Sequence, residues 1–201
     1  MQQSLQYMRE QLQGQYPDSE IRALWQRTLE SLGLSGGQTL LRGKDTQLSA
    51  NERTQIRKIT EELKKYRPLQ YILGQTEFYG LPFRVNEQVL IPRPETEELT
   101  EWVLKTVQGA GCRVQGAGCG VQGERCRANG AGLRIWDIGT GSGCIAVTLA
   151  KHLPEAEVYA SDISGGALEV AEYNARFNKV SVRFFRHDIF STDAAVPVAA
   201  C

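Results

Sequence analysis

The stretch WDIGTGSG, residues 136–143, has the composition of a ligand-binding loop. Three glycines stand at alternate positions and follow an apolar run that contains an aspartate. A glycine has no Cβ, so it permits positive φ angles and lets a ligand touch the main chain. The spacing therefore predicts a tight loop with bare backbone. The residues predicted to bind a ligand there are Asp137, Gly139, Thr140, Gly141, Ser142 and Gly143.

The spacing of the glycines separates two classes of nucleotide-like ligand. Dinucleotide-binding loops usually read G-x-G-x-x-G and place a pyrophosphate at a helix N-terminus. This loop reads G-x-G-x-G, with Asp137 two residues ahead of the first glycine. A carboxylate there favours a ligand that carries positive charge. S-adenosylmethionine has an ammonium and a sulfonium group and no phosphate, so the loop predicts this cofactor over NAD.

Two further acidic residues stand where the next two predicted strands end. Asp162 closes the run EVYASD, where a carboxylate can accept hydrogen bonds from both ribose hydroxyls. NAD would use the same acid, so Asp162 does not distinguish the two cofactors. Asp188 closes VRFFRHD and is placed to approach an adenine. A helix cap or a solvated strand end explains Asp188 equally well.

Strand-like and helix-like segments alternate around these motifs. The strands are LRIWDI, EVYASD and VRFFRHD, and the helices between them are CIAVTLAKHL and GALEVAEYNARF. Such alternation is typical of parallel β-α units. It predicts an α/β domain with a doubly wound sheet, in which ligands lie at the carboxyl ends of the strands.

The first third of the chain reads as a small helical bundle, residues 1–68. In DSEIRALWQRTLESLG the apolar residues recur on one helix face, with Asp18 or Ser19 as the cap and Gly33 as the stop. In SANERTQIRKITEELKKY a Ser-x-x-Glu capping box opens another helix, and SLQYMREQL supplies a third. Core packing explains these stripes without a ligand. The stripe expected after the capping box consists of Ile56, Ile59, Leu63 and Tyr66.

A change of pattern separates this bundle from the α/β domain. Residues 69–94 hold short β-like pieces, for which Gly80, Pro82 and Asn86 supply turn residues, so they predict a hairpin that links two domains. The helix ETEELTEWVLKTV opens the last part, residues 95–201, with acidic residues in its first turn.

A seven-residue unit occurs three times, as VQGAGCR, VQGAGCG and VQGERCR, from Val107 to Arg127 within a Gly/Cys-rich insertion of residues 107–132. Six residues separate each of its cysteines from the next, and no histidine lies nearby. This argues against a zinc site, and we expect no metal. The glycines oppose a helix, so heptad spacing does not indicate a coiled coil. We expect a flexible surface loop that arose by duplication.

Charge and hydropathy exclude several classes of protein. The 23 Lys and Arg balance 23 Asp and Glu, so no net charge draws the chain to nucleic acid or to an anionic membrane. No apolar run has the length of a spanning helix, and the N-terminal residues lack the apolar centre of a signal peptide. We expect a cytoplasmic protein with no direct nucleic-acid partner.

Four segments in order, PLQYILGQTEFYGLPFRV, VLIPRPETEELTEWVL, WDIGTGSGCIAVTLA and ASDIS, carry a family resemblance. They resemble the N5-glutamine methyltransferases of peptide chain release factors, the PrmC or HemK family, over nearly the whole chain apart from the repeat. IPRPETE is the most specific part, because many methyltransferases share the glycine loop. The resemblance implies a helical domain that docks the release factor, a hairpin linker and a Rossmann-like domain that methylates the glutamine of the factor's GGQ motif.

Carried over by position, the resemblance implies roles for individual residues. Residues 139–143 and Asp162 would hold S-adenosylmethionine, and Ile189, next to Asp188, would lie by the adenine. The residues implied to line the approach to the active site are Arg93, Pro94 and Glu95.

The sequence departs from the family after RHDIF. The family carries its catalytic N-P-P-Y signature downstream of that segment, whereas this sequence runs STDAAVPVAAC. An amide nitrogen is a poor nucleophile, so the chemistry depends on acceptors, in the family an asparagine and a proline carbonyl, that orient the NH2 group. We therefore expect a truncated chain that at most binds its ligands, and we name no catalytic residue. Without the downstream strands we expect LRIWDI to form an apolar, exposed edge of the sheet.

Several functions remain open at the level of sequence. The first is the family activity, and the second is a non-catalytic chain that binds only the cofactor or the release factor. An adenine-N6 methyltransferase of nucleic acid is disfavoured by the neutral charge, and a dinucleotide-dependent oxidoreductase by the loop spacing. The tetrapeptide SGGQ, residues 35–38, contains the tripeptide that the family modifies, but a Gly-Gly turn between helices explains it better.

Overall fold

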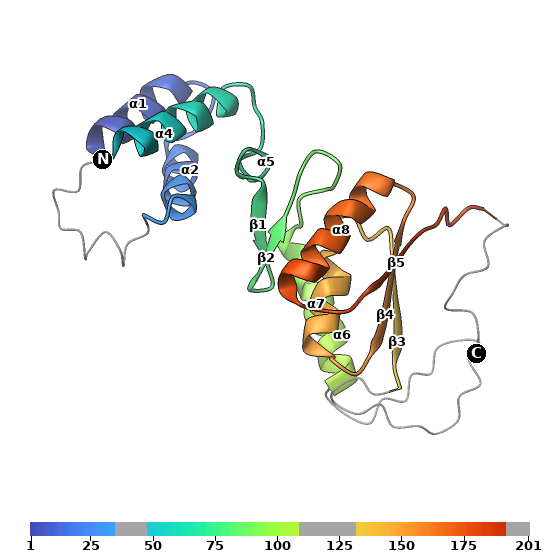
Figure 1. Ribbon diagram of the computed structural model, residues 1–201. Helices are drawn as coiled ribbons and strands as arrows, with labels where there is room; N and C mark the ends of the chain where they lie inside the picture. Colours follow the sequence, from blue (N-terminus) through green and yellow to red (C-terminus); the bar gives the residue numbers. More distant parts are fainter. Residues whose placement is uncertain (35–47, 109–131, 192–201) are drawn as a thin grey trace. The chain divides into compact units, whose positions relative to one another are not determined.

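The computed structural model describes residues 1–34, 48–108 and 132–191. Its backbone contacts divide the chain into two compact units, Met1–Leu73 and Gly74–Cys201, whose elements are labelled in Figure 1. The tetrapeptide SGGQ and all but the first two residues of the repeat lie outside the described residues. The turn predicted for SGGQ and the flexible loop predicted for the repeat therefore stay predictions.

The first unit is a bundle of helices with its own apolar core. Its helices are α1 (Gln2–Leu12), α2 (Asp18–Ser31), α4 (Ala50–Leu63) and the short α5 (Leu69–Leu73). α1 packs against both α2 and α4. Each helix turns one apolar stripe toward this common core, as the periodicity predicted. Buried members of the core include Met8, Leu12, Ile21, Trp25, Leu29, Ile56, Ile59 and Leu63.

Two predicted helix ends are confirmed. In the capping box, the N–H of Ser49 donates to the Glu52 carboxylate at 2.6 Å, and the N–H of Glu52 donates to Ser49 Oγ at 3.2 Å. α2 stops at Gly33, whose φ is 69°. There the N–H of Leu34 donates to the Leu29 carbonyl at 2.8 Å, which is the Schellman arrangement. Local residue chemistry decides both ends.

Two other local predictions are wrong. Neither Asp18 nor Ser19 caps α2, because Pro17 takes the N-cap position with extended backbone and no side chain caps the helix. Tyr66 does not continue the stripe of α4. The helix ends at Leu63, Tyr66 follows with a φ of 58°, and its side chain is 65% exposed. Helical spacing has no meaning beyond the end of the helix.

The predicted hairpin is confirmed, and it consists of antiparallel β1 (Gln75–Phe78) and β2 (Leu81–Arg84). Tyr79 and Gly80 form its turn, with φ angles of 51° and 72°. Two successive positive φ angles are the geometry of a tight type I′ turn. Pro82 is not a turn residue as predicted, since it lies within β2 opposite Glu77.

The hairpin belongs to the second unit. Its aromatic residues Phe78 and Phe83 are buried and pack in one cluster with Val147 and Ala175. The contact-based division of the chain falls ahead of β1, after Leu73. A separate linker over residues 69–94 therefore stays a prediction.

The second unit holds the predicted parallel sheet. Its strands are β3 (Arg134–Ile138), β4 (Glu157–Asp162) and β5 (Arg183–Arg186), in the order β3-β4-β5. Its helices are α6 (Pro94–Gln108), α7 (Cys144–His152) and α8 (Gly165–Asn178). Strands and helices alternate from β3 to β5, which confirms the α/β, Rossmann-like fold class. Within the described residues β3 forms one edge of the sheet.

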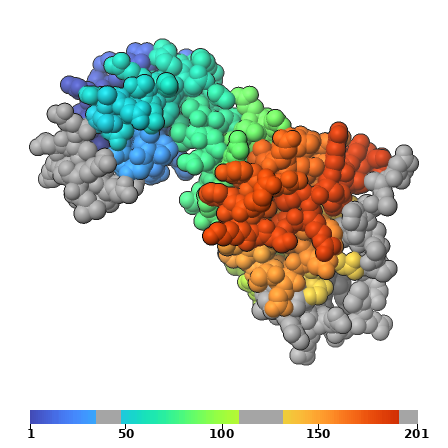
Figure 2. All heavy atoms as spheres, in the orientation of Figure 1, coloured from blue at the N-terminus to red at the C-terminus, as the bar shows by residue number. Residues whose placement is uncertain are grey.

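Helices α7 and α8 cover the same face of this sheet (Figure 1). Because β3, β4 and β5 are neighbours in chain order, both crossovers lie on one side, which is one half of a doubly wound arrangement. Small residues line the contact, among them Ala146 and Ala150 of α7 against Ala160 of β4. α6 packs on α7 in turn. The outer side of α8 remains at the molecular surface (Figure 2), where Phe177 is 55% exposed.

Gly143 is the point where the loop enters α7, and the packing there leaves little room for a side chain. Its φ is 79°, which L residues other than glycine rarely adopt. A Cβ built on Gly143 would lie 3.0 Å from the Cβ and 3.2 Å from the Cα of Ala171 in α8. Of the three loop glycines, this one therefore serves the close approach of two helices.

We expect Gly143→Ala to lower the free energy of unfolding by about 1–3 kcal/mol, because the new methyl group adds a backbone clash to an unfavourable φ. Urea unfolding followed by circular dichroism measures the change. Gly165→Ala is the matched control, since a Cβ at that position meets open space within the described residues and Gly165 opens a helix. Equal free energies of unfolding for Gly143→Ala and the unaltered chain would contradict this prediction, because they would show that α8 moves aside without loss of stability.

Candidate functional site

The carboxyl ends of β3 and β4 bring two of the predicted acids together. Asp137 is the fourth of the five residues of β3, and Asp162 is the last residue of β4. The glycine loop leaves between them, and the N–H groups of Gly139 and Thr140 both donate to the Ser161 carbonyl, at 2.8 and 2.9 Å. The loop is therefore fastened to the neighbouring strand at its first turn.

Asp137 supports the loop by accepting hydrogen bonds from it and from the start of α7. Its Oδ2 accepts hydrogen bonds from Thr140 Oγ1 at 2.6 Å and from the Ala146 N–H at 3.3 Å. Ala146 lies in the first turn of α7, so the carboxylate faces the positive end of that helix. Within the described residues Oδ1 of Asp137 accepts no hydrogen bond, and this oxygen is available to a ligand.

The Asp137 carboxyl has a perturbed pKa. Burial raises the pKa above its ordinary value, and the nearby charge of Asp162 adds to the rise. The hydrogen bonds from Thr140 and from the Ala146 amide oppose it, because both stabilise the ionised form. A positively charged ligand beside Asp137 would act in the same direction as these two hydrogen bonds.

Asp162 holds the backbone on both sides of the site. Its Oδ2 accepts from the N–H of Gly141 at 2.9 Å, and its Oδ1 accepts from the N–H of Ser164 at 2.9 Å. Each carboxylate oxygen has two lone pairs. One lone pair on each oxygen is therefore left for a donor such as a ribose hydroxyl.

The three loop glycines differ in what surrounds them. A Cβ built on Gly139 or on Gly141 would meet open space within the described residues, although both have positive φ angles, 73° and 54°. Gly143, by contrast, faces α8. Bare backbone that a ligand can reach is thus found at Gly139 and Gly141, while Thr140 and Ser142, which each follow one of these glycines, are buried.

The amide groups of the loop are already engaged. The N–H groups of Gly139 and Thr140 bond to Ser161, that of Gly141 to Asp162, and that of Gly143 to the Thr140 carbonyl at 2.8 Å. A pyrophosphate needs free N–H donors and the positive end of a helix. Here the donors are used and a carboxylate occupies the helix end. The loop is therefore poorly suited to a phosphate group.

The other predicted site residues lie at the surface. Asp188 follows β5, and its Oδ1 accepts from the Phe190 N–H at 3.0 Å, so the side chain closes its own turn. Ile189 beside it is 56% exposed. Within the described residues, no hydrogen bond or ion pair joins the start of α6 to the glycine loop. The exposed residues at that start are Arg93, Pro94 and Glu95.

Sequence reasoning missed Asn174 of α8. Its side chain is fully buried and donates to the Ser142 carbonyl of the glycine loop at 2.8 Å. The signal was present in the sequence, because Asn174 and Asn178 stand in an otherwise apolar helical stripe that includes Ala167 and Ala171. A polar residue in such a stripe must find a hydrogen-bond partner in the interior.

Other features of the described residues offer no site of their own. No three side chains of His, Cys, Asp or Glu in the described ranges gather to hold a metal ion. Burial raises the pKa of the Cys144 thiol to about 11, which keeps it protonated and unreactive at neutral pH. Of the helices in the described ranges, none combines the length and apolar character needed to cross a bilayer.

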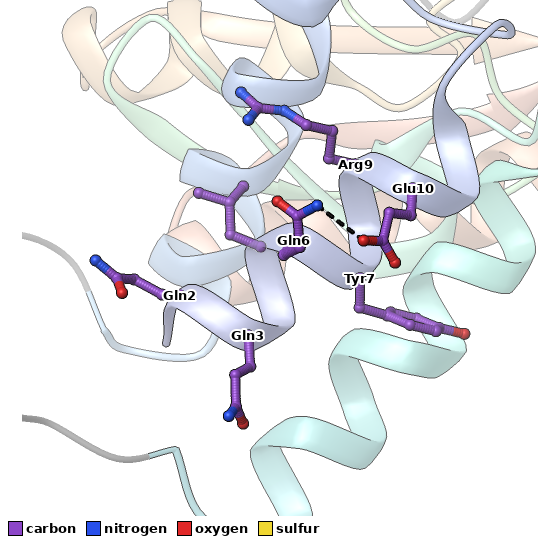
Figure 3. A pocket seen from close by; sticks show the side chains of 7 residues that line it. Gln2, Gln3, Gln6, Tyr7, Arg9 and Glu10 are labelled. Carbon is purple, nitrogen blue, oxygen red and sulfur yellow. Dashed lines mark hydrogen bonds between the residues drawn. The ribbon is translucent and has the colours of Figure 1, made fainter.

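A surface hollow of about 520 Å³ lies along α1 in the first unit (Figure 3). Its described lining comes from α1, between Gln2 and Glu10, where Gln6 Nε2 donates to Glu10 Oε1 one turn along the same helix at 2.8 Å. Size alone does not make it a catalytic site, because its lining includes none of the predicted cofactor residues among those described.

Two protein families match the two parts of this chain. Residues 3–74 match the PrmC N-terminal domain, and residues 125–197 match the methyltransferase small domain. The first match covers the helical unit, and the second includes the glycine loop with the strands and helices around it.

Curated relatives share one name. The chain is 39% identical over 178 residues to a release factor glutamine methyltransferase of Flavobacterium psychrophilum, covering 89% of this chain and 56% of that protein. It is 40% identical over 188 residues to the protein of that name from Bacteroides thetaiotaomicron, covering 93% and 59%. The chain thus spans somewhat more than half the length of these relatives.

Similarity to solved structures is looser. A tRNA (uracil-54, C5)-methyltransferase of Pyrococcus abyssi, solved with S-adenosyl-L-homocysteine, aligns over 57% of this chain and 23% of its own, with 17% identity and a TM-score of 0.40. An alignment this loose adds nothing to the match of the sequence.

The raised pKa of Asp137 predicts a pH dependence of stability. Since burial raises the pKa in the folded state above that in the unfolded state, the folded protein binds the proton more tightly. The associated stability is present below the unfolded pKa and is lost as pH rises through the folded pKa. We expect the free energy of unfolding of the unaltered chain, relative to Asp137→Asn, to fall as pH rises across this window.

Urea unfolding of both proteins at a series of pH values measures that difference. Thr140→Val is the second arm, because it removes the hydrogen bond that stabilises the ionised carboxylate and should extend the fall to higher pH. Parallel curves for the unaltered chain and Asp137→Asn would contradict the assignment.

Proposed function

Because the two parts of the chain match the PrmC N-terminal domain and the methyltransferase small domain, and its relatives are release factor glutamine methyltransferases, we propose that it belongs to that family. In this proposal it binds S-adenosylmethionine at its glycine loop and contributes this site to methylation of a release factor. The acceptor in this proposal is the side-chain amide nitrogen of the glutamine in the factor's GGQ motif. Translation ends in the cytoplasm, so the proposed reaction is cytoplasmic.

The cofactor proposal rests on the hydrogen bonds that the N–H groups of the loop already make within the protein. Four N–H groups of the loop donate within the protein, and Asp137 faces the start of α7. A phosphate would meet a carboxylate and few free donors there, whereas a cation would meet the unbonded Oδ1 of Asp137. Open space beside Gly139 and Gly141 gives a ligand access to the main chain. These properties support a cationic, phosphate-free nucleoside.

The residues present fit such a nucleoside, and each would contact a different portion of it. Asp137 would face a cationic group of the cofactor, and Asp162 would accept from the ribose hydroxyls with its remaining lone pairs. Gly139 and Gly141 would lie against the cofactor through their backbone. When bound, S-adenosylmethionine supplies an electrophilic methyl group on its sulfonium sulfur. The buried residues that would hold the loop in shape are Thr140, Ser142 and Gly143.

The remaining predicted residues have weaker support. Asp188 and Ile189 would lie by the adenine, which agrees with their place after β5 at the same edge of the sheet as Asp162. Arg93, Pro94 and Glu95 would line the approach of the glutamine. The first unit would dock the release factor. The described 201-residue sequence contains no Asn-Pro-Pro-Tyr, so no residue is assigned to orienting the acceptor amide.

We expect calorimetric titration to detect binding of S-adenosylhomocysteine and no binding of NAD at equal concentrations. Asp162→Ala should weaken that binding roughly ten- to a hundredfold, which is about 1.4–2.8 kcal/mol for the lost ribose hydrogen bonds. Glu157→Ala is the matched control, because this exposed acid stands at the opposite end of β4. Tighter binding of NAD than of S-adenosylhomocysteine would overturn the cofactor assignment.

A second experiment tests the partner. We expect the chain, saturated with S-adenosylhomocysteine, to bind a purified release factor, and binding can be measured by the same calorimetry. Labelled S-adenosylmethionine then separates an enzyme from a binder. Label on the GGQ glutamine, absent when that glutamine is replaced by alanine, identifies a catalyst, and binding without label identifies a non-catalytic chain. Absence of both would remove the release factor as partner.

A further inference from the structure

The amide of Asn174 is fully buried and bonded in three directions. Its Oδ1 accepts from the N–H of Arg84 at 2.7 Å, and its Nδ2 donates to the Arg84 carbonyl at 3.0 Å. The same Nδ2 donates to the Ser142 carbonyl at 2.8 Å. Both N–H groups of the side chain are therefore used. A buried amide with complete hydrogen bonding fixes the position of every group that it contacts.

These hydrogen bonds join two segments that are distant in sequence. Arg84 is the last residue of β2, and its backbone N–H and carbonyl meet Asn174 in the manner of a neighbouring strand. Ser142 lies between two loop glycines. One side chain of α8 thus ties the hairpin to the glycine loop.

The peptide bond between Ser142 and Gly143 is held at both ends. Asn174 binds its carbonyl oxygen, and the Thr140 carbonyl accepts from its N–H at 2.8 Å. This peptide is the step at which the loop turns into α7, because Gly143 is the N-cap of that helix. Rotation of the peptide would break both hydrogen bonds and move Gly141 beside it.

Asn178 provides a comparison one helical turn later. Its Nδ2 donates to the carbonyls of Pro82 and Asn174, each at 3.0 Å. It is buried like Asn174 and also anchors β2. Within the described residues, however, it makes no hydrogen bond to the glycine loop. The two asparagines therefore both donate from Nδ2 to a carbonyl of β2, but only Asn174 also bonds the glycine loop.

We propose that Asn174 is a positioning residue for the cofactor loop, and that through it the β1–β2 hairpin forms part of the cofactor site. Asn174 does not touch the cofactor itself. It holds the Ser142 carbonyl against a backbone that belongs to the hairpin, so the conformation of Gly139 to Gly143 depends on β2. The link to the cofactor rests on the function proposed above.

The coupling is reciprocal. A ligand that orders the loop strengthens the hydrogen bond between Asn174 and Ser142, and this in turn orders Arg84. Exchange of the Arg84 amide, which donates to Asn174, should therefore slow when the cofactor binds. The N–H of Val85 donates to the Gly74 carbonyl instead, so it is an internal reference beside Arg84.

The test compares Asn174→Asp with Asn178→Asp in the full chain. Each substitution keeps the shape of the side chain and replaces an NH2 group that faces two carbonyl oxygens by an oxygen. Both variants lose a hydrogen bond to the backbone of β2, but only Asn174→Asp loses the hydrogen bond to the glycine loop. Amide exchange of Gly141 and Gly143 without ligand, thermal midpoints, and calorimetric affinity for S-adenosylhomocysteine are measured on both.

We expect Asn174→Asp to speed amide exchange at Gly141 and Gly143 by about tenfold or more. We also expect it to lower the affinity for S-adenosylhomocysteine at least about tenfold. Asn178→Asp should change these exchange rates and this affinity by less than about threefold, even where the thermal midpoints of the two variants fall equally. Equal effects of the two variants on the loop would overturn the proposal and leave Asn174 a structural residue.

Two further arms keep the outcome decisive. If Asn174→Asp does not fold, the unaltered chain is used, and a failure of S-adenosylhomocysteine to slow Arg84 exchange relative to Val85 overturns the proposal. If the unaltered chain does not bind S-adenosylhomocysteine, the proposed function fails, and loop exchange in the two variants still decides whether Asn174 positions the loop.

Discussion

The structure of the candidate site depends on one constraint, which is that a loop of bare backbone must satisfy its polar groups where the regular pairing of β3 with β4 ends. Where the chain leaves β3 the ladder of the sheet ends, and glycines supply no side chains to cover the main chain. The Ser161 carbonyl of β4 and two side chains, Asp162 of β4 and Asn174 of α8, bond the loop backbone. Asp137 adds a hydrogen bond from the Thr140 hydroxyl and one from the Ala146 N–H at the start of α7. Buried backbone groups left without partners are costly, so these anchors fix one loop conformation among many that glycine permits.

This arrangement has an electrostatic consequence. The anchors that hold the loop include two carboxylates, and burial together with their mutual repulsion raises the pKa of Asp137. The loop thus carries an unfavourable concentration of negative charge in the absence of a ligand. A cation at the loop offsets that cost, whereas a phosphate increases it. The same groups that shape the backbone would therefore also favour a cationic ligand in the proposed site.

Much of the fold follows from local sequence, and the remainder depends on contacts between distant residues. The capping box, the stop at Gly33 and the alternation of strands and helices were predictable, because each is decided within a few residues. Tyr66 failed because the helix ended before it. Asn174 was not found because its partners, Arg84 and Ser142, are 90 and 32 residues away. The role of Gly143 likewise depends on α8, so the three glycines looked equivalent in the sequence.

The place of the hairpin follows from the same long-range contacts. A linker is expected to lie between bodies and to make few contacts with either. β1 and β2 instead bury Phe78 and Phe83 against the helices of the second unit, and two asparagines of α8 bond to the backbone of β2. Displacing this hairpin would expose aromatic surface and remove both hydrogen bonds between the buried amide of Asn174 and Arg84. The hairpin therefore packs with the body that holds the glycine loop, and the Asn174 side chain bonds both the backbone of Arg84 and the Ser142 carbonyl.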